Sequence, residues 1–159
     1  MLHSFLQWLY DQAVSTSVRE SDAIFPALEC IHIYSMIFLI TAIAAFDLRL
    51  LGFQFGRHPI TFPKFSKLVF RSAGACFAVN VITGGFLFAA KAPDYYANAA
   101  FRVKMLLILA GVAYHLLLLS RASRWEVVPM KTFAIRFVGA ISLLLWIGVI
   151  AASRWIAFA

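Results

Sequence analysis

The sequence predicts an all-α protein, namely an integral membrane four-helix bundle with an N-terminal interfacial amphipathic helix. Of the 159 residues, 63% are apolar and only 13% are charged, whereas roughly a quarter of the residues in soluble domains are charged. The mean hydropathy is +0.86, and four apolar stretches each extend to the roughly 20 residues that cross a bilayer as a helix. A transmembrane barrel is excluded because its strands alternate apolar and polar residues, and these stretches do not.

The first element is expected to be a short interfacial helix at about residues 2–14. Apolar residues recur there at helical spacing with polar residues between them, at Leu2, Phe5, Leu6, Leu9 and Ala13. Ser17, followed three residues later by Glu20, is a capping-box pattern that predicts a new helix near Val18. Pro26 is then expected at a kink or a restart near the membrane surface.

Four spans are predicted at about residues 23–48, 68–91, 100–121 and 133–156, so residues 1–159 form a single transmembrane domain. The segments that follow the first and third apolar stretches hold most of the basic residues, which are Arg49, Arg57, Lys64, Lys67, Arg71, Arg121, Arg124, Lys131 and Arg136. By the positive-inside rule these segments are cytoplasmic, and both termini are periplasmic in a bacterial inner membrane. The net charge of +7 is therefore interpreted as a topology signal and not as a sign of nucleic-acid binding.

Polar side chains within the spans are the candidates for chemistry, because ionisable groups in hydrocarbon are costly and favour function. Glu29 and His32 lie in the first predicted span, Asn80 in the second and His115 in the third. At helical spacing, Glu29 lies one turn above His32 and Met36 one turn below it. Glu29 could accept the second N–H of the His32 ring and orient it, as the outer partners of ligand histidines do.

Small residues on the predicted helices indicate that the polar faces meet inside one bundle. Gly111 lies on the same stripe as His115 and is expected to leave space one turn outward of its ring. Stripes rich in small residues allow close approach of helices in membranes. They occur on the second span at Ala73, Cys76, Asn80, Gly84 and Leu87, and on the fourth at Gly139, Ser142 and Trp146.

The leading interpretation is that His32, His115 or both are axial ligands of haem b, since facing side chains of a four-helix bundle hold such cofactors. In this interpretation, Met36 and Gly111 shape the pocket and Asn80 hydrogen-bonds near it. The alternative is that both histidines are satisfied polar residues that join helices.

Depth argues against a single haem held by both histidines. With span centres near Ile37 and Ala110, His32 and His115 lie about 7 Å on opposite sides of the midplane. One haem would bridge them only if the span centres were misjudged or the helices were inclined. Otherwise each histidine would need another partner, which could be His3 for the outer site and His58 for the inner one. The propionates of a haem could pair with Arg102, Lys104 or Arg49.

Several motifs spread over nearly the whole chain support a family resemblance. They are Arg19-Glu20-Ser21, Pro26-Ala27-Leu28-Glu29-Cys30-Ile31-His32, Asp47-Leu48-Arg49-Leu50-Leu51-Gly52, Thr83-Gly84-Gly85-Phe86-Leu87-Phe88, Phe101-Arg102-Val103-Lys104-Met105, His115, Ser142-Leu143-Leu144-Leu145-Trp146 and Arg154-Trp155-Ile156. With them the chain resembles a bacterial four-helix inner-membrane family catalogued as a domain of unknown function. It is also distantly similar to small b-type membrane cytochromes and to the membrane domains of copper-resistance proteins.

Three functions are therefore expected as alternatives. The first is haem-based electron transfer between the quinone pool, or a periplasmic donor, and a partner protein. The second is copper handling with His32, Met36 and Cys30 as soft ligands. The third is a structural or accessory subunit without a cofactor. The sequence has no serine elbow, no H-E-x-x-H motif, no Gly-rich phosphate loop and no paired carboxylates within a span, so any catalysis would come from a cofactor. The lipid bilayer is the expected partner, and self-association stays open.

Overall fold

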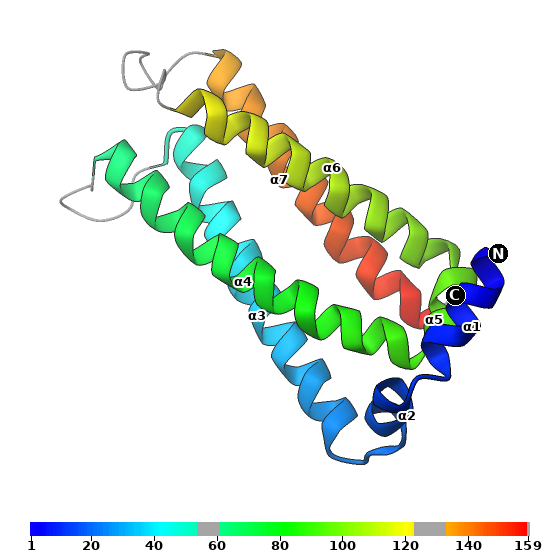
Figure 1. Ribbon diagram of the computed structural model, residues 1–159. Coiled ribbons are helices and arrows are strands. Elements are labelled where there is room, and N and C mark those ends of the chain that lie inside the picture. The colour runs from blue at the N-terminus through cyan, green and yellow to red at the C-terminus, as the bar shows by residue number, and fades with distance from the viewer. Residues whose placement is uncertain (54–60, 123–132, 159) are drawn as a thin grey trace.

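The computed structural model describes residues 1–53, 61–122 and 133–158, and its regular structure is entirely helical (Figure 1). The four long helices are α3 (Ile24–Leu50), α4 (Phe62–Ala90), α6 (Ala99–Ala122) and α7 (Phe133–Trp155). Each is long and apolar enough to cross a membrane. The predicted fold class is confirmed, and the chain is a multi-pass membrane protein.

The N-terminal segment differs from the prediction, because it forms two short helices, α1 (Leu2–Tyr10) and α2 (Ala13–Glu20). The hydroxyl of Ser15 donates to the carbonyl of Leu9 over 2.7 Å, and the guanidinium of Arg19 donates to the carbonyl of Tyr10 over 3.2 Å. These side chains satisfy carbonyls that a helix leaves open at its C-terminal end, so the chain can turn after α1. Ser17 consequently lies inside α2 and does not cap a new helix.

The start of α3 is defined by Ser21 and not by a kink in the span. The Ser21 hydroxyl accepts a hydrogen bond of 3.1 Å from the backbone N–H of Ile24, the first residue of α3. Pro26 follows in the first turn, where an N–H donor to an earlier carbonyl is not needed. Pro26 therefore lies where the helix restarts, which is one of the two expected outcomes.

The second span is longer than the sequence indicates, because α4 begins at Phe62 and not near residue 68. Thr61 precedes the helix and Pro63 lies in its first turn, which is a common start signal. The cations Lys64, Lys67 and Arg71 thus belong to the first turns of α4 and not to a loop. Hydropathy alone does not detect such turns, since they extend beyond the apolar stretch.

The long helices form two closely packed pairs, and packing between one helix of each pair joins the pairs. Helix α3 packs on α4, α6 packs on α7, and α3 joins the pairs by packing on α7 (Figure 1). Two apolar clusters fill the core. Their buried members are Leu39, Ile43, Ala73, Trp146 and Val149 in one, and Phe46, Leu50, Val69, Leu118 and Ile135 in the other.

Gly139 allows the close contact between α3 and α7. A Cβ atom added at Gly139 would lie 2.9 Å from the backbone oxygen of Asp47 and 3.1 Å from the Cβ of Leu50. Only a residue without a side chain fits there, so the small-residue stripe on this helix does mark a helix–helix contact, as expected for membrane bundles.

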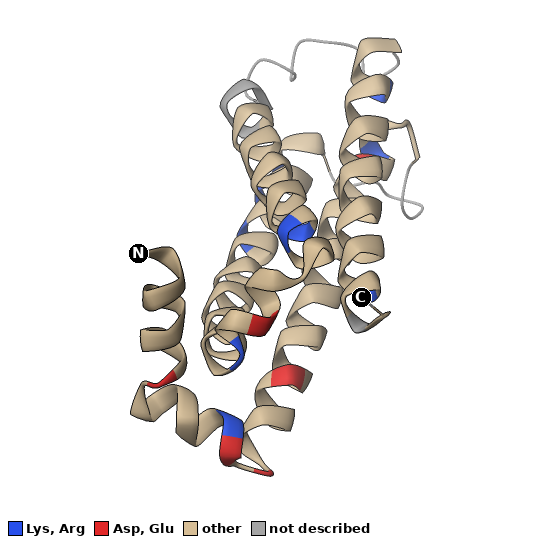
Figure 2. Cartoon of the chain, turned by 90° about the vertical axis from the view of Figure 1, so that its right-hand side faces the viewer, with Lys and Arg blue, Asp and Glu red and all other residues tan. Residues whose placement is uncertain are grey.

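Both chain termini lie at one end of the bundle, which we call the terminal end (Figure 1). Helices α1, α2 and α5 (Ala92–Ala97) gather there, with α1 against α5 and α2 against α4 and α3. At the opposite end α3 finishes at Leu50 and α4 begins at Phe62. Charged residues occupy few positions along the long helices (Figure 2).

The outward surfaces of the long helices are apolar. Large exposed apolar side chains occur on all four, among them Ile33, Phe38, Leu68, Ile82, Leu106, Leu109, Leu144 and Ile147. Such a surface suits hydrocarbon, and helices can face it because their backbone hydrogen bonds are satisfied internally. The predicted contact with a lipid bilayer is compatible with this surface.

Candidate functional site

His32 is a half-buried residue of α3 whose ring faces α4. Its Nδ1 lies 3.0 Å from Oγ1 of Thr83, and the Thr83 hydroxyl donates to the carbonyl of Val79 over 2.8 Å. Because the hydroxyl hydrogen points to Val79, Oγ1 accepts from the ring. In that arrangement, neutral His32 carries its hydrogen on Nδ1 and has its lone pair on Nε2.

Gly84 makes room for this ring. A Cβ atom at Gly84 would lie 3.0 Å from Cε1 and 3.4 Å from Nδ1 of His32. The neighbouring Gly85 has open space at the same position. Thr83 and Gly84 thus fix the orientation of the imidazole from the side of α4, one by a hydrogen bond and the other by contact with its backbone.

The orienting partner of His32 is not the one expected from helical spacing. Glu29 is exposed, and the hydrogen bond of Nδ1 goes to Thr83. Asn80 was expected to form a hydrogen bond near His32. Its amide donates to the Ser35 hydroxyl over 2.6 Å, and that hydroxyl donates to the carbonyl of His32 over 3.0 Å. Asn80 therefore joins α3 to α4 directly beside His32.

Lys104 brings a third helix to the same region. It is half-buried on α6 and lies close enough to His32 for an electrostatic interaction. Helices α4 and α6 are not among the closely packed helix pairs in the described part of the chain. The surroundings of His32 thus combine a hydrogen-bond acceptor, a small residue and a cation from two other helices. Met36, predicted to shape this site, is half-buried one turn below His32.

His115 lies in a different and tighter environment, with only 8% of its surface exposed. Its Nδ1 donates to the carbonyl of Gly111 over 3.0 Å, and its Nε2 lies 3.4 Å from the hydroxyl of Ser142. The rings of Phe70, Tyr114 and Trp146 contact it edge-on, with centroids 6.3, 6.1 and 6.0 Å away. Protein side chains therefore enclose this imidazole.

The expected free space beside Gly111 does not exist. A Cβ atom at Gly111 would lie 3.4 Å from Cζ2 of Trp146, because the indole packs against that position. Spacing along one helix identifies which residues share a stripe but not which side chain of a neighbouring helix fills the space beside them. Gly111 serves as the hydrogen-bond acceptor of His115 and as a contact for the indole, and it opens no pocket.

The two histidines contact α4 at distant levels. His32 meets it at Thr83 and His115 meets it at Phe70, and at 1.5 Å per residue these levels are about 20 Å apart. Two ligands of one iron lie on opposite sides of a single atom, so the two imidazoles belong to separate sites. The expectation that depth separates them therefore agrees with the packing.

Asp47 is a buried residue that the sequence places at the very end of the first predicted span, next to the basic segment that follows. Helix α3 continues to Leu50, which places Asp47 inside the bundle with 0% of its surface exposed. Neither of its carboxylate oxygens has a hydrogen-bond partner within the described residues. The end of an apolar stretch was the only available signal, and helix ends are the hardest positions to locate.

The described residues contain no group of three or more His, Cys, Asp and Glu side chains placed to hold a metal ion. Cys30, an expected copper ligand, is exposed. It lies two positions before His32, and residues two apart on a helix do not face each other. The structure thus does not gather the predicted copper ligands on α3.

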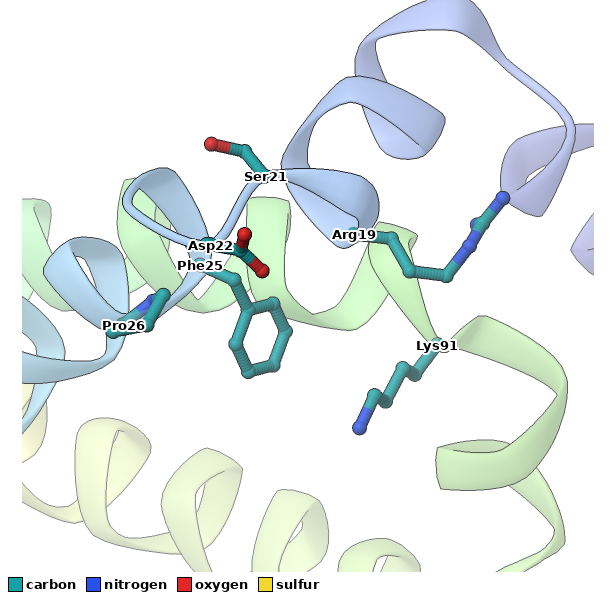
Figure 3. A pocket seen from close by; sticks show the side chains of 6 residues that line it. All are labelled: Arg19, Ser21, Asp22, Phe25, Pro26 and Lys91. Carbon is teal, nitrogen blue, oxygen red and sulfur yellow. The ribbon is translucent and has the colours of Figure 1, made fainter.

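An open pocket of about 250 Å³ lies at the terminal end (Figure 3), lined by Arg19, Ser21, Asp22, Phe25, Pro26 and Lys91. The guanidinium of Arg19 donates to the carbonyls of Tyr10 and Ala90 over 3.2 and 3.4 Å, and in Figure 3 it points away from Lys91. The ammonium of Lys91 lies 5.2 Å from the centre of the Phe25 ring. The two cations do not converge on one ligand position.

The model of a family of unknown function, DUF6644, matches residues 16–159. No curated protein and no solved structure has a significant match to the chain.

Proposed function

The chain belongs to the DUF6644 family, and we propose that it is a membrane-embedded haem b protein that transfers electrons in the bacterial inner membrane, with His32 as an axial ligand. The observation that carries this proposal is the state of the His32 ring. Its Nδ1–H donates a hydrogen bond to Thr83, so the lone pair that could bind iron is on Nε2. Ligand histidines show the same division, with one nitrogen on the metal and the other donating to an outer partner.

The residues around His32 suit a haem in two further ways. Gly84 leaves its imidazole room beside α4, and Lys104 supplies a half-buried cation from α6. A buried cation is costly without a counter-ion, and a haem propionate would provide one through a charge-assisted hydrogen bond. Among the cations expected to pair with propionates, Lys104 is the one that the packing supports.

The bound haem would supply a one-electron redox couple, and the chain's own residues define its environment. Thr83 keeps the hydrogen of His32 on Nδ1, and Asn80 with Ser35 joins α3 and α4 beside it. Hydrogen bonding to the axial ligand and burial in a low dielectric are the levers by which a protein sets a haem potential. Electron transfer needs no further chemistry from the chain.

His115 is left out of this haem site. Phe70, Tyr114 and Trp146 surround its ring, and its Nε2 faces Ser142. A porphyrin at that nitrogen would displace core side chains. The proposal therefore assigns one ligand position to His32 and none to His115.

The proposed orientation follows the positive-inside rule, with the basic opposite end in the cytoplasm and the terminal end in the periplasm. His32 lies two helical turns from Phe25, a lining residue of the terminal-end pocket. An electron donor or acceptor, either a quinone or a periplasmic protein, would thus approach the haem from the periplasmic side.

A visible spectrum of the protein purified in detergent tests this proposal. With ample haem supplied during expression, we expect a Soret band that sharpens and shifts on reduction, together with iron in the sample. A colourless protein would overturn the proposal. Copper at about one ion per chain would then favour the copper alternative, whereas a sample with neither metal would favour a structural subunit.

Gly84 and Gly85 offer a matched pair of variants on α4. In Gly84→Val the new side chain meets the His32 ring, since even its Cβ would be 3.0 Å from Cε1. We expect haem affinity to fall about tenfold, in the range seen when the outer support of a ligand is lost. Gly85→Val should leave haem binding unchanged because its Cβ meets nothing within 4 Å. Equal haem content in the two variants would contradict the assigned position of the ring.

A further inference from the structure

A cluster of buried polar side chains lies apart from His32, where three helices meet. It consists of Asp47 of α3, His115 of α6 and Ser142 of α7, with 0%, 8% and 0% of their surfaces exposed. The indole N–H of Trp146 is also buried there without a hydrogen-bond partner in the described chain. Polar groups this deep in a membrane bundle are costly unless they interact with one another or bind something.

Ser142 connects the acid to the base. Its hydroxyl lies 3.4 Å from Nε2 of His115 and is also the hydrogen-bonding side chain that approaches the carboxylate of Asp47. That approach is longer or less well aligned than an ordinary hydrogen bond, since both carboxylate oxygens are unpartnered within the described residues. His115 Nδ1 already donates to the carbonyl of Gly111, so Nε2 is its proton-accepting atom.

The other polar groups around the carboxylate have different roles. The Tyr114 hydroxyl donates to the carbonyl of Val138 over 2.8 Å and interacts electrostatically with Asp47. The guanidinium of Arg49, on the same helix, lies 5.4 Å from the centre of the Phe65 ring of α4. Helix α4 adds the ring of Phe70 beside His115. Among the described titratable groups, Tyr114 thus interacts with the Asp47 carboxylate, and Arg49 lies two residues further along α3 with its guanidinium at the Phe65 ring.

We propose that Asp47, Ser142 and His115 form a proton-binding relay inside the bundle. In the first step a proton from solvent binds to the Asp47 carboxylate. The O–H bond of the Asp47 acid then breaks, and Ser142 Oγ gains that proton. At the same time the original O–H bond of Ser142 breaks, and its proton forms an N–H bond at His115 Nε2. A neutral acid and a neutral imidazole become a carboxylate and an imidazolium, and the hydroxyl is regenerated.

The relay is independent of haem binding, because the levels of His32 and His115 on α4 are about 20 Å apart. Its charge-separated form is stabilised from both sides. The carbonyl of Gly111 holds the second N–H of the imidazolium, and Ser142 can donate to the new carboxylate. In this relay, the buried acid Asp47 and the buried base His115 thus exchange one proton through Ser142.

Infrared and NMR titration of the full-length protein tests the relay. We expect a carboxylic-acid band that disappears in Asp47→Asn, and a His115 ¹⁵N resonance that changes over the same pH range as that band. In Ser142→Ala the two titrations should separate by about one pH unit, a tenfold change in proton affinity. Ser142→Thr, which keeps a hydroxyl, should restore the joint titration.

Ser153→Ala is the matched control, because Ser153 lies on the same helix and donates only to the carbonyl of Val149 in its own helix. It should titrate as the wild type does. The relay is overturned if the carboxylic-acid band persists in Asp47→Asn, or if Ser142→Ala leaves both titrations unchanged. Because Ser142→Ala removes only one oxygen, it tests the proposal even if Asp47→Asn does not fold.

Discussion

Replacing His32 with alanine is expected to abolish the Soret band, while His115→Ala is expected to keep it. In His32→Ala the nitrogen that would bind iron is lost, together with the Nδ1 hydrogen bond to Thr83. In His115→Ala only the enclosed imidazole beside Ser142 is removed. The measurement is the ratio of haem to protein in detergent, taken from the reduced-minus-oxidised spectrum.

Two controls make this result decisive. Circular dichroism should show that both variants keep their helix content, so that loss of haem is not loss of fold. Added imidazole should restore part of the Soret band in His32→Ala, because it can enter the space left by the side chain. If His115→Ala bleaches the band and His32→Ala does not, the proposed haem position is wrong.

Replacing Gly139 with leucine is expected to cause the largest loss of stability among the glycine variants. Its Cβ alone would lie 2.9 Å from the backbone oxygen of Asp47, and a backbone atom cannot rotate away as the end of a side chain can. Helices α3 and α7 would have to separate, which would weaken the main contact between the two helix pairs. We expect a loss of about 3 kcal/mol, at the upper end of overpacking costs.

Unfolding in mixed micelles with increasing denaturing detergent measures this loss. Gly74→Leu is the matched control, since a Cβ at Gly74 of α4 meets nothing within 4 Å and the position is exposed. That variant should be at least as stable as the wild type because glycine is a poor helix former. Similar unfolding midpoints for the two variants would show that the α3–α7 contact is looser than the structure indicates.

Residues on one helix could be grouped from the sequence, but their partners across the bundle could not. His32 and Asn80 stood out because polar groups are rare in apolar spans, and the structure does place them side by side across α3 and α4. Glu29 was expected to orient His32 because it lies one turn away. Thr83, on another helix, has that role, and a hydroxyl that also bonds its own helix leaves no distinct pattern in the sequence.

Asp47 shows a second reason why the sequence did not predict every buried polar residue. Hydropathy ended the first span near residue 48 and so placed Asp47 at the edge of the membrane, beside the charges that follow. The helix runs to Leu50 and turns the carboxylate into the core. Whether a polar residue at the end of a span faces water or protein depends on the rotation of its helix. For α3 that rotation depends on its packing against α4 and α7, including the close approach of Gly139 to the backbone of Asp47.

Composition, together with the order of apolar and polar residues along the chain, determined the lipid solvent, the all-helical class and the number of spans. In hydrocarbon a backbone must satisfy its own hydrogen bonds, so an apolar stretch of sufficient length has one structure to adopt. Only the tertiary structure decided which side chains meet: Thr83 and Gly84 at His32, Trp146 at Gly111, and Ser142 between Asp47 and His115. Those contacts depend on the crossing and rotation of helices, which many distant residues set together.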